Sequence, residues 1–154
     1  MHRFPSRTKS RSGLLLALCA LAAGCGDSPR QVNAACTEGD GALRAALRAA
    51  PAQVRLGGAR LSDCLTKGAD GDELQLVGTS FVEAASGLAV RARRQPEGRS
   101  ALELGYLVAA AHRGGRTTQG VHDELLRRLD QELITVDTRA RAYRRGKRAG
   151  RDGG

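Results

Sequence analysis

The strongest constraint on the fold is a run of apolar residues at helical spacing in the middle of the chain. Between residues 70 and 94 these side chains recur at intervals of three and four, as Leu74, Val77, Phe81, Ala84, Leu88 and Ala92. Such spacing places them on one face of an α-helix. The run begins at Asp70 and Glu73, which resemble a capping box, and it closes before Pro96. We therefore predict one long amphipathic helix in this segment.

Shorter patterns predict further helices around it. Residues 40–50 are amphipathic, and Ser62 can cap a short helix that stops at Gly68. Residues 100–112 contain a second long stripe, and a third begins near residue 118 and fades near Gly146. Aromatic residues make up only 3% of the chain, with no Trp, so the core is built from Leu, Val and Ala. That composition favours packed helices over a sheet. We predict an all-α fold, a bundle of three main helices with one or two short N-terminal helices.

The segment 54–60, with Gly57 and Gly58, is expected to be an extended loop between the short helices. Small residues also interrupt the long stripes. Gly105 and Ala109 form a small-x-x-x-small pair, and the polar residues around them exclude a membrane-spanning helix. We expect this pair to allow a close crossing of helices in the core.

The formal charge of +9 is concentrated at the two ends of the chain. Residues 1–24 contain four bases and no acid, and residues 139–154 contain seven bases and one acid. The segment between them therefore has a net charge of −1. A basic leader and a basic tail thus flank a nearly neutral domain.

The N-terminal segment has the organisation of an export signal. A basic region is followed by twelve apolar or small residues at 13–24, too few to span a bilayer. The segment ends Leu21-Ala22-Ala23-Gly24-Cys25, which resembles the lipobox of bacterial lipoprotein precursors. The resemblance implies that the thiol of Cys25 receives diacylglycerol and that the bond between Gly24 and Cys25 is cut. Here Ala22 stands where that family usually has Leu.

Lipidation would anchor the protein outside the cytoplasm. In a bacterium with one membrane we expect the outer face of the cytoplasmic membrane. In a bacterium with lipoprotein sorting we expect the outer membrane, because Gly26 rather than Asp follows the cysteine. The alternative is ordinary secretion after a small-x-small triplet such as 20–22. Residues 25–35 would form a lipidated tether, and residues 36–138 the helical domain.

Two cysteines remain once the leader is removed and Cys25 is acylated. Cys36 and Cys64 form an even pair in an exported domain, which indicates a disulfide. A redox pair or a metal site is the alternative, but both require shorter spacing or histidine partners.

No motif in the chain indicates an active site, a metal site or a cofactor site. His112 is expected at the end of one helix, where a positive charge suits the dipole, and His122 with Asp123 in the first turn of the last helix, where an acid is favoured. Asp72 and its acidic neighbours lack the ligand spacing of a calcium loop, and capping is the better interpretation. No nucleophile elbow or phosphate-binding loop occurs. We name no catalytic residue.

The basic tail is the clearest candidate for binding. Its bases are Arg139, Arg141, Arg144, Arg145, Lys147, Arg148 and Arg151. They could gather anionic lipid headgroups or an anionic wall polymer, and export argues against nucleic acid. Its glycines predict disorder, so an inert, solvated tail is the competing interpretation.

The runs Leu61–Leu65 and Leu104–Val108 look similar to uncharacterised exported proteins of high-GC actinobacteria, a resemblance that implies no activity. We therefore expect a non-catalytic binding or envelope-organising lipoprotein with no cofactor. A polyanion-binding protein acting through the tail, and an enzyme with an unrecognised site, are the alternatives.

Overall fold

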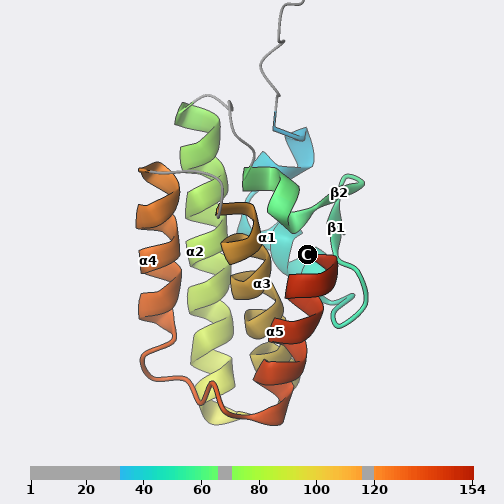
Figure 1. The fold of residues 1–154 in the computed structure, drawn as a ribbon, viewed down its shortest axis with the longest axis vertical. Helices are drawn as coiled ribbons and strands as arrows, with labels where there is room; N and C mark the ends of the chain where they lie inside the picture. The colour runs from blue at the N-terminus through green and yellow to red at the C-terminus, as the bar shows by residue number, and fades with distance from the viewer. Residues whose placement is uncertain (1–31, 66–70, 116–119) are drawn as a thin grey trace, which may run out of the picture.

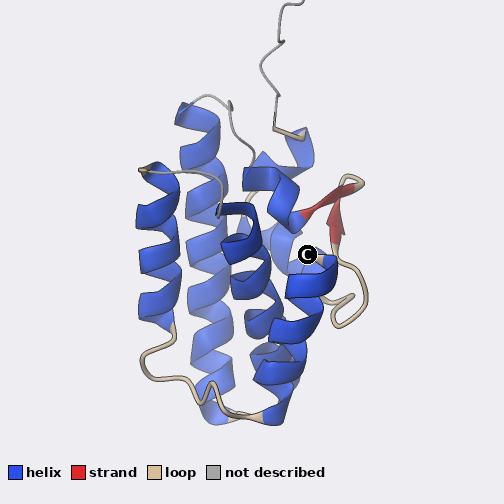
Figure 2. Ribbon diagram, in the orientation of Figure 1, coloured by secondary structure: helices blue, strands red, loops and turns tan. Residues whose placement is uncertain are grey.

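The computed structural model describes residues 32–65, 71–115 and 120–154. These residues form a bundle of helices with one small hairpin, which confirms the all-α prediction (Figure 1, Figure 2). In chain order the elements are the 3-10 helix η1 (Ala34–Thr37), α1 (Asp40–Leu47), β1 (Arg55–Leu56), β2 (Ala59–Arg60), the 3-10 helix η2 (Leu61–Leu65), α2 (Gly71–Arg94), α3 (Arg99–Gly115), α4 (Val121–Glu132) and α5 (Arg141–Gly153).

Helix α3 is the centre of the bundle. It is buried at every position from Ala101 to Ala111, and it contacts α2, α4 and α5. A helix that is apolar nearly all round has to be enclosed by its neighbours. Its one buried acid, Glu103, accepts a hydrogen bond at 2.9 Å from the guanidinium of Arg99 one turn earlier. The neighbouring helices α2, α4 and α5 therefore pack around α3.

The predicted long helix appears as α2, with the expected apolar residues buried from Val77 to Ala92. The short predicted helix at residues 40–50 appears as α1. The predicted disulfide is confirmed, since Cys36 in η1 is bonded to Cys64 in η2. This bond ties the N-terminal part of the domain to the segment that precedes α2.

The segment expected to be a loop is a short antiparallel hairpin. Arg55 pairs with Arg60 and Leu56 with Ala59, and Gly57 and Gly58 form the turn with positive φ angles. The Asn33 side chain donates to the carbonyl of Gly57 at 3.1 Å and so fixes the hairpin against η1. The glycine pair was thus the signal of a tight turn.

The last predicted helix is divided in two, which corrects the prediction of a single helix from residue 118 to Gly146. Helix α4 ends at Glu132, and the side chain of Asp137 accepts from the backbone N–H of Arg139 at 2.9 Å in the connection. Val136 and Ala140 are nevertheless buried. The apolar pattern was correct, but a turn at Asp137 reverses the chain so that α5 packs on α3.

The prediction of a disordered tail at residues 139–154 is wrong. Residues 141–153 form α5, which packs along α3 and extends the domain beyond residue 138 (Figure 1). Its inner face consists of Tyr143, Gly146 and Gly150. A Cβ at Gly146 or Gly150 would collide with the backbone of α3, so the glycines permit the close approach of the two helices.

Gly105 on α3 fits the same contact. A Cβ at this position would collide with the backbone of α5 around Tyr143. The expected use of Gly105 in a close helix crossing is therefore confirmed. The tail glycines were interpreted as a sign of disorder because helix propensity alone disfavours them.

Several predictions fall outside the described residues. They concern Gly24 and Cys25, the tether as far as residue 31, Gly68, Asp70 and the threonines before α4. Among the described helices, none combines the length and the apolar character that crossing a membrane requires.

Candidate functional site

The bases of the C-terminal segment lie on the outer face of α5. The exposed residues of this helix include Arg141, Arg144, Arg145, Lys147, Arg148 and Arg151, which we call the α5 surface. The opposite face packs on α3 through Tyr143 and the glycines. Burial raises the pKa of Tyr143 to about 12, with a further increase from Asp130. The fold therefore presents one continuous basic helix face to solvent, and Arg139 precedes it in the connecting loop.

Both ends of α5 are held by charged side chains from other elements. The carboxylate of Glu97, between α2 and α3, accepts from the backbone N–H groups of Arg141 at 2.9 Å and of Ala142 at 3.0 Å. These two hydrogen bonds lower the pKa of Glu97, and the nearby Arg141 side chain lowers it further. At the other end, Arg113 of α3 donates to the carbonyls of Arg151 and Asp152, both at 2.9 Å. Each charge also suits the helix dipole, so α5 is fixed at both ends.

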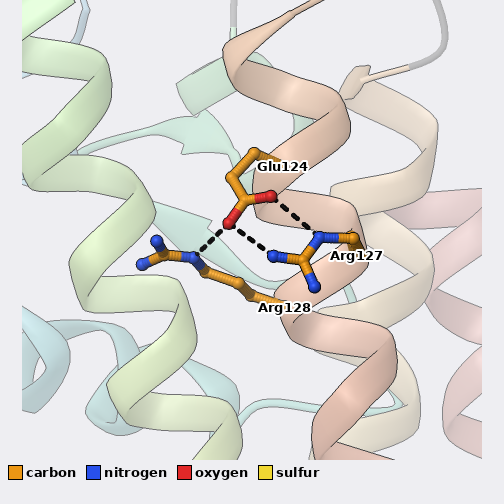
Figure 3. Close-up of polar contacts among 3 residues, drawn as sticks. All are labelled: Glu124, Arg127 and Arg128. Carbon is orange, nitrogen blue, oxygen red and sulfur yellow. Dashed lines mark hydrogen bonds and ion pairs between the residues drawn. The ribbon is translucent and has the colours of Figure 1, made fainter.

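Apart from Arg141, which lies near Glu97, the charges of the α5 surface are not neutralised locally. Within the described part of the chain, none of its six side chains forms an ion pair with a carboxylate. Helix α4 is different, because Glu124 accepts from Arg127 and Arg128 at 2.7 to 2.8 Å (Figure 3). Those two arginines lower the pKa of Glu124 to about 2. The exposed charge of α4 is partly cancelled, whereas that of α5 is available to an external anion.

A groove runs beside the first half of the α5 surface, where α5 passes the start of α3. Its volume is about 550 Å³, and its lining is Glu97, Gly98, Arg99, Leu102, Arg141, Ala142, Arg144, Arg145 and Arg148. The guanidinium of Arg99 is already bonded to Glu103 and to the carbonyl of Arg48. Arg141 lies near the carboxylate of Glu97, so Arg144, Arg145 and Arg148 are the groove side chains left to bind an anion.

The same end of the bundle contains further bases and one exposed apolar side chain. Arg91, Arg93 and Arg94 are exposed in the last turn of α2. Arg93 donates at 2.8 Å to the hydroxyl of Thr135 in the α4–α5 connection, which places the two segments side by side. Next to Thr135, Ile134 is 80% exposed. This end thus combines bases with an apolar tip.

A second candidate site is a cavity of about 350 Å³ between α2 and α4. Its lining is Leu65, Gly71, Leu74, Gln75, Gly78, Thr79, Val82, Glu83, His122, Glu124, Leu125 and Arg128. His122 is only 5% exposed, and its Nε2 has no hydrogen-bond partner. Desolvation lowers the pKa of His122, although Asp123 opposes the shift. His122 is therefore a neutral, buried polar group with an unused hydrogen-bonding atom.

The two histidines predicted at helix ends thus have different environments. His112, in the last turn of α3, is partly exposed, and its Nε2 lies 3.0 Å from the carboxylate of Asp130 on α4. His122 does lie in the first turn of α4, but sequence reasoning missed its burial. The missed signal is its spacing, since His122, Leu125 and Leu129 lie on one face of the helix.

The described residues contain no cluster of three or more His, Cys, Asp or Glu side chains that could hold a metal ion. The cysteines of the domain are both in the disulfide. What the described arrangement can do chemically is bind an anion on the α5 surface and enclose a small molecule beside His122.

No family model matches the chain, and neither the curated proteins nor the solved structures contain a significant match to it. The function therefore has to be argued from the two sites themselves.

Proposed function

We propose that this protein is an exported lipoprotein, anchored through Cys25, whose helical domain binds anionic lipid headgroups through the α5 surface. The lipobox-like sequence before Cys25 supports the anchor. The disulfide between Cys36 and Cys64 agrees with an oxidising compartment outside the cytoplasm. The observation that carries the binding function is the ordered basic face of α5, whose side chains form no ion pair with a carboxylate among the described residues.

An ordered helix makes the bases a better binding surface than a flexible tail would be. The backbone of α5 is already fixed by Glu97 and Arg113, so binding does not have to order it. A base near an anionic membrane contributes about 1 kcal/mol. With three or four of the six bases in contact, the domain would bind with about 3 to 4 kcal/mol. Such binding is weak alone but becomes effective when a lipid anchor holds the domain at the bilayer.

A lipid surface explains the exposed apolar side chain near the bases, which a soluble polymer as the ligand does not. Ile134 exposes most of its side chain at the same end as Arg93 and the start of α5. An apolar side chain beside bases suits the headgroup boundary of a bilayer. A hydrophilic wall polymer offers no such environment.

The chain enters the bundle at one end, and the α4–α5 connection lies at the other (Figure 1). Helix α2, with 24 residues, separates the two ends by about 36 Å. Residues 25–31 reach at most about 25 Å when fully extended. The domain would therefore lie along the anchoring bilayer, with the side formed by α5 toward the headgroups, rather than stand with its basic end down.

The anchor is tested by mass spectrometry of the membrane fraction. The expected N-terminal residue is a diacylglycerol-modified Cys25. An unmodified N-terminus at any other residue would refute the anchor and leave the headgroup-binding proposal to be tested separately.

Headgroup binding is tested on the unlipidated mature domain with vesicles of phosphatidylglycerol or of phosphatidylcholine. The wild type should bind only the anionic vesicles, and the double variant Arg144→Gln, Arg145→Gln should lose at least tenfold in affinity. The matched control is Arg127→Gln, Arg128→Gln, which removes the same formal charge from α4. It should bind nearly as the wild type does, because those arginines are paired with Glu124.

Equal losses in the two double variants would contradict the proposal, since they would indicate an effect of net charge alone. A soluble polyanion such as polyphosphate serves as the competing probe. If it binds the wild type while anionic vesicles do not, the lipid proposal is wrong and a wall polymer becomes the better candidate.

A further inference from the structure

The cavity between α2 and α4 has the properties of a small-molecule site and is separate from the α5 surface. Its volume of about 350 Å³ falls within the range of ligand pockets. Apolar side chains form much of its wall, among them Leu65, Leu74, Val82 and Leu125. Six polar side chains also line it, three from each helix: Gln75, Thr79 and Glu83 on α2, and His122, Glu124 and Arg128 on α4.

One of these polar groups, His122, has a buried nitrogen atom without a hydrogen-bond partner among the described residues. His122 is 5% exposed, and no hydrogen bond reaches its Nε2. Buried polar atoms in folded proteins are nearly always bonded, and an exception indicates a missing partner such as a water or a ligand. Nε2 itself is buried, and no group of the described residues donates to it or accepts from it.

We propose that the cavity between α2 and α4 binds a small amphiphile whose uncharged hydroxyl group forms a hydrogen bond with His122, while its apolar chain packs against the leucines of the wall. A hydroxyl group both donates and accepts, so it pairs with either tautomer of a neutral imidazole. The proposal stands independently of headgroup binding by α5.

The surroundings of His122 favour an uncharged head group. A charge placed beside a buried group loses its hydration, and no described residue offers His122 a compensating hydrogen bond. The lowered pKa of His122 indicates the same preference, since the site already disfavours a charge on the imidazole itself. Arg128, which also lines the cavity, is bonded to Glu124 and does not offer a free cation to an acid.

A substitution at Gly78 can fill the cavity. It lines the cavity from the middle of α2, and a Cβ built on it meets only the Leu125 side chain, at the ordinary distance of 3.8 Å. A larger side chain at this position would therefore extend into the cavity without colliding with the backbone. This makes Gly78→Leu a variant that fills the site while keeping the helix.

The experiment measures binding of 1-octanol to the whole mature protein by calorimetry and by the nuclear magnetic resonance shifts of the His122 imidazole. Octanoate and octylammonium are the charged probes of the same chain length. The proposal predicts saturable binding of 1-octanol with a shift at His122, and binding of the two charged probes at least tenfold weaker.

Two variants and one control complete the test. His122→Leu and Gly78→Leu should each weaken 1-octanol binding at least tenfold, while their helix content stays that of the wild type. His112→Leu, which changes a histidine outside the cavity lining, should bind 1-octanol as the wild type does.

The proposal is overturned if 1-octanol does not bind saturably to the wild type, or if His122→Leu binds it unchanged. It is also overturned if a charged probe binds more tightly than 1-octanol. Should either leucine variant lose its helix content, the shift of the wild-type His122 signal on titration decides alone.

Discussion

At the scale of single residues, burial rather than residue type separates the two histidines of the domain. His112 lies near the surface, with its Nε2 3.0 Å from the carboxylate of Asp130. His122 is enclosed between α2 and α4, and desolvation lowers its pKa below the ordinary value of 6.5. An enclosed imidazole without a partner reduces the stability of the fold. Its presence is explained if the group serves a ligand rather than the core.

The stability of the protein tests this interpretation through His122→Leu. Replacing a buried, unpartnered polar group by an apolar one should raise the free energy of unfolding by about 1 kcal/mol. Urea unfolding of the wild type and the variant at pH 7.5 measures the difference. A clear loss of stability would indicate a hydrogen bond that the described residues do not show.

The same pair of proteins should differ in their response to acid. The unfolded chain binds a proton at His122 more readily than the folded chain does, because the folded pKa is the lower one. Stability is therefore full above about pH 6.5 and falls as the pH drops toward the folded pKa. His122→Leu should remove this part of the acid sensitivity. Identical pH dependence in the two proteins would contradict the assigned burial.

At the scale of the elements, the contact between α3 and α5 depends on glycine. Gly146 and Gly150 on α5, with Gly105 on α3, lie where a Cβ would collide with the facing backbone. Helix propensity disfavours glycine by about 1 kcal/mol per residue relative to alanine, so α5 would be a poor helix alone. Its order comes from packing on α3 and from the bonds at its ends.

Substituting alanine for glycine distinguishes the effect of helix packing on stability from the effect of helix propensity. Gly146→Ala should lower the free energy of unfolding by about 1–3 kcal/mol, as overpacking does, because the facing backbone of α3 cannot yield freely. Gly41→Ala in α1 is the matched control, since nothing lies within 4 Å of a Cβ there. The control should be neutral or slightly stabilising. Chemical denaturation measures both, and a stabilising Gly146→Ala would contradict the close packing of α5.

The sequence was most informative where a helix carries its own regular apolar face. The stripe from Leu74 to Ala92 predicted α2, and the run at 100–112 predicted α3, because both faces bury large side chains. It was least informative about α5, whose buried face consists of Tyr143 and glycines. The complementary pair on α3 was recognised, but its partner in the tail was not, since spacing within one segment does not reveal which other segment it faces.

The candidate sites show the same division. The bases of the tail were identified from charge alone, and the structure adds the order that makes them a surface. The cavity beside His122 could not be predicted, because it depends on how α4 lies against α2. Cavities form between helices, and a single sequence predicts the helices but not the distance between them.

At the scale of the whole molecule, the disulfide joins the two 3-10 helices η1 and η2 of the N-terminal part. It closes a loop between Cys36 and Cys64, 28 positions apart, that includes α1 and the hairpin. Closing a loop of this length contributes about 3–4 kcal/mol by the chain-entropy argument. The double variant Cys36→Ser, Cys64→Ser should lose stability by that amount in urea unfolding, with α2 and α3 still formed. A loss below about 1 kcal/mol would show that the N-terminal part is held by packing alone.

The central claim is that one side of the bundle, formed by α5, faces anionic headgroups while the side formed by α4 does not. Paramagnetic relaxation from gadolinium-chelating lipids in phosphatidylglycerol vesicles tests it most directly, with the domain anchored through Cys25. The account predicts the strongest relaxation of amide signals from Arg144 to Arg148, and weak relaxation around Arg127 on α4, the far side of the bundle (Figure 1). Stronger relaxation on α4 than on α5, or equal relaxation of the two helices, would contradict it.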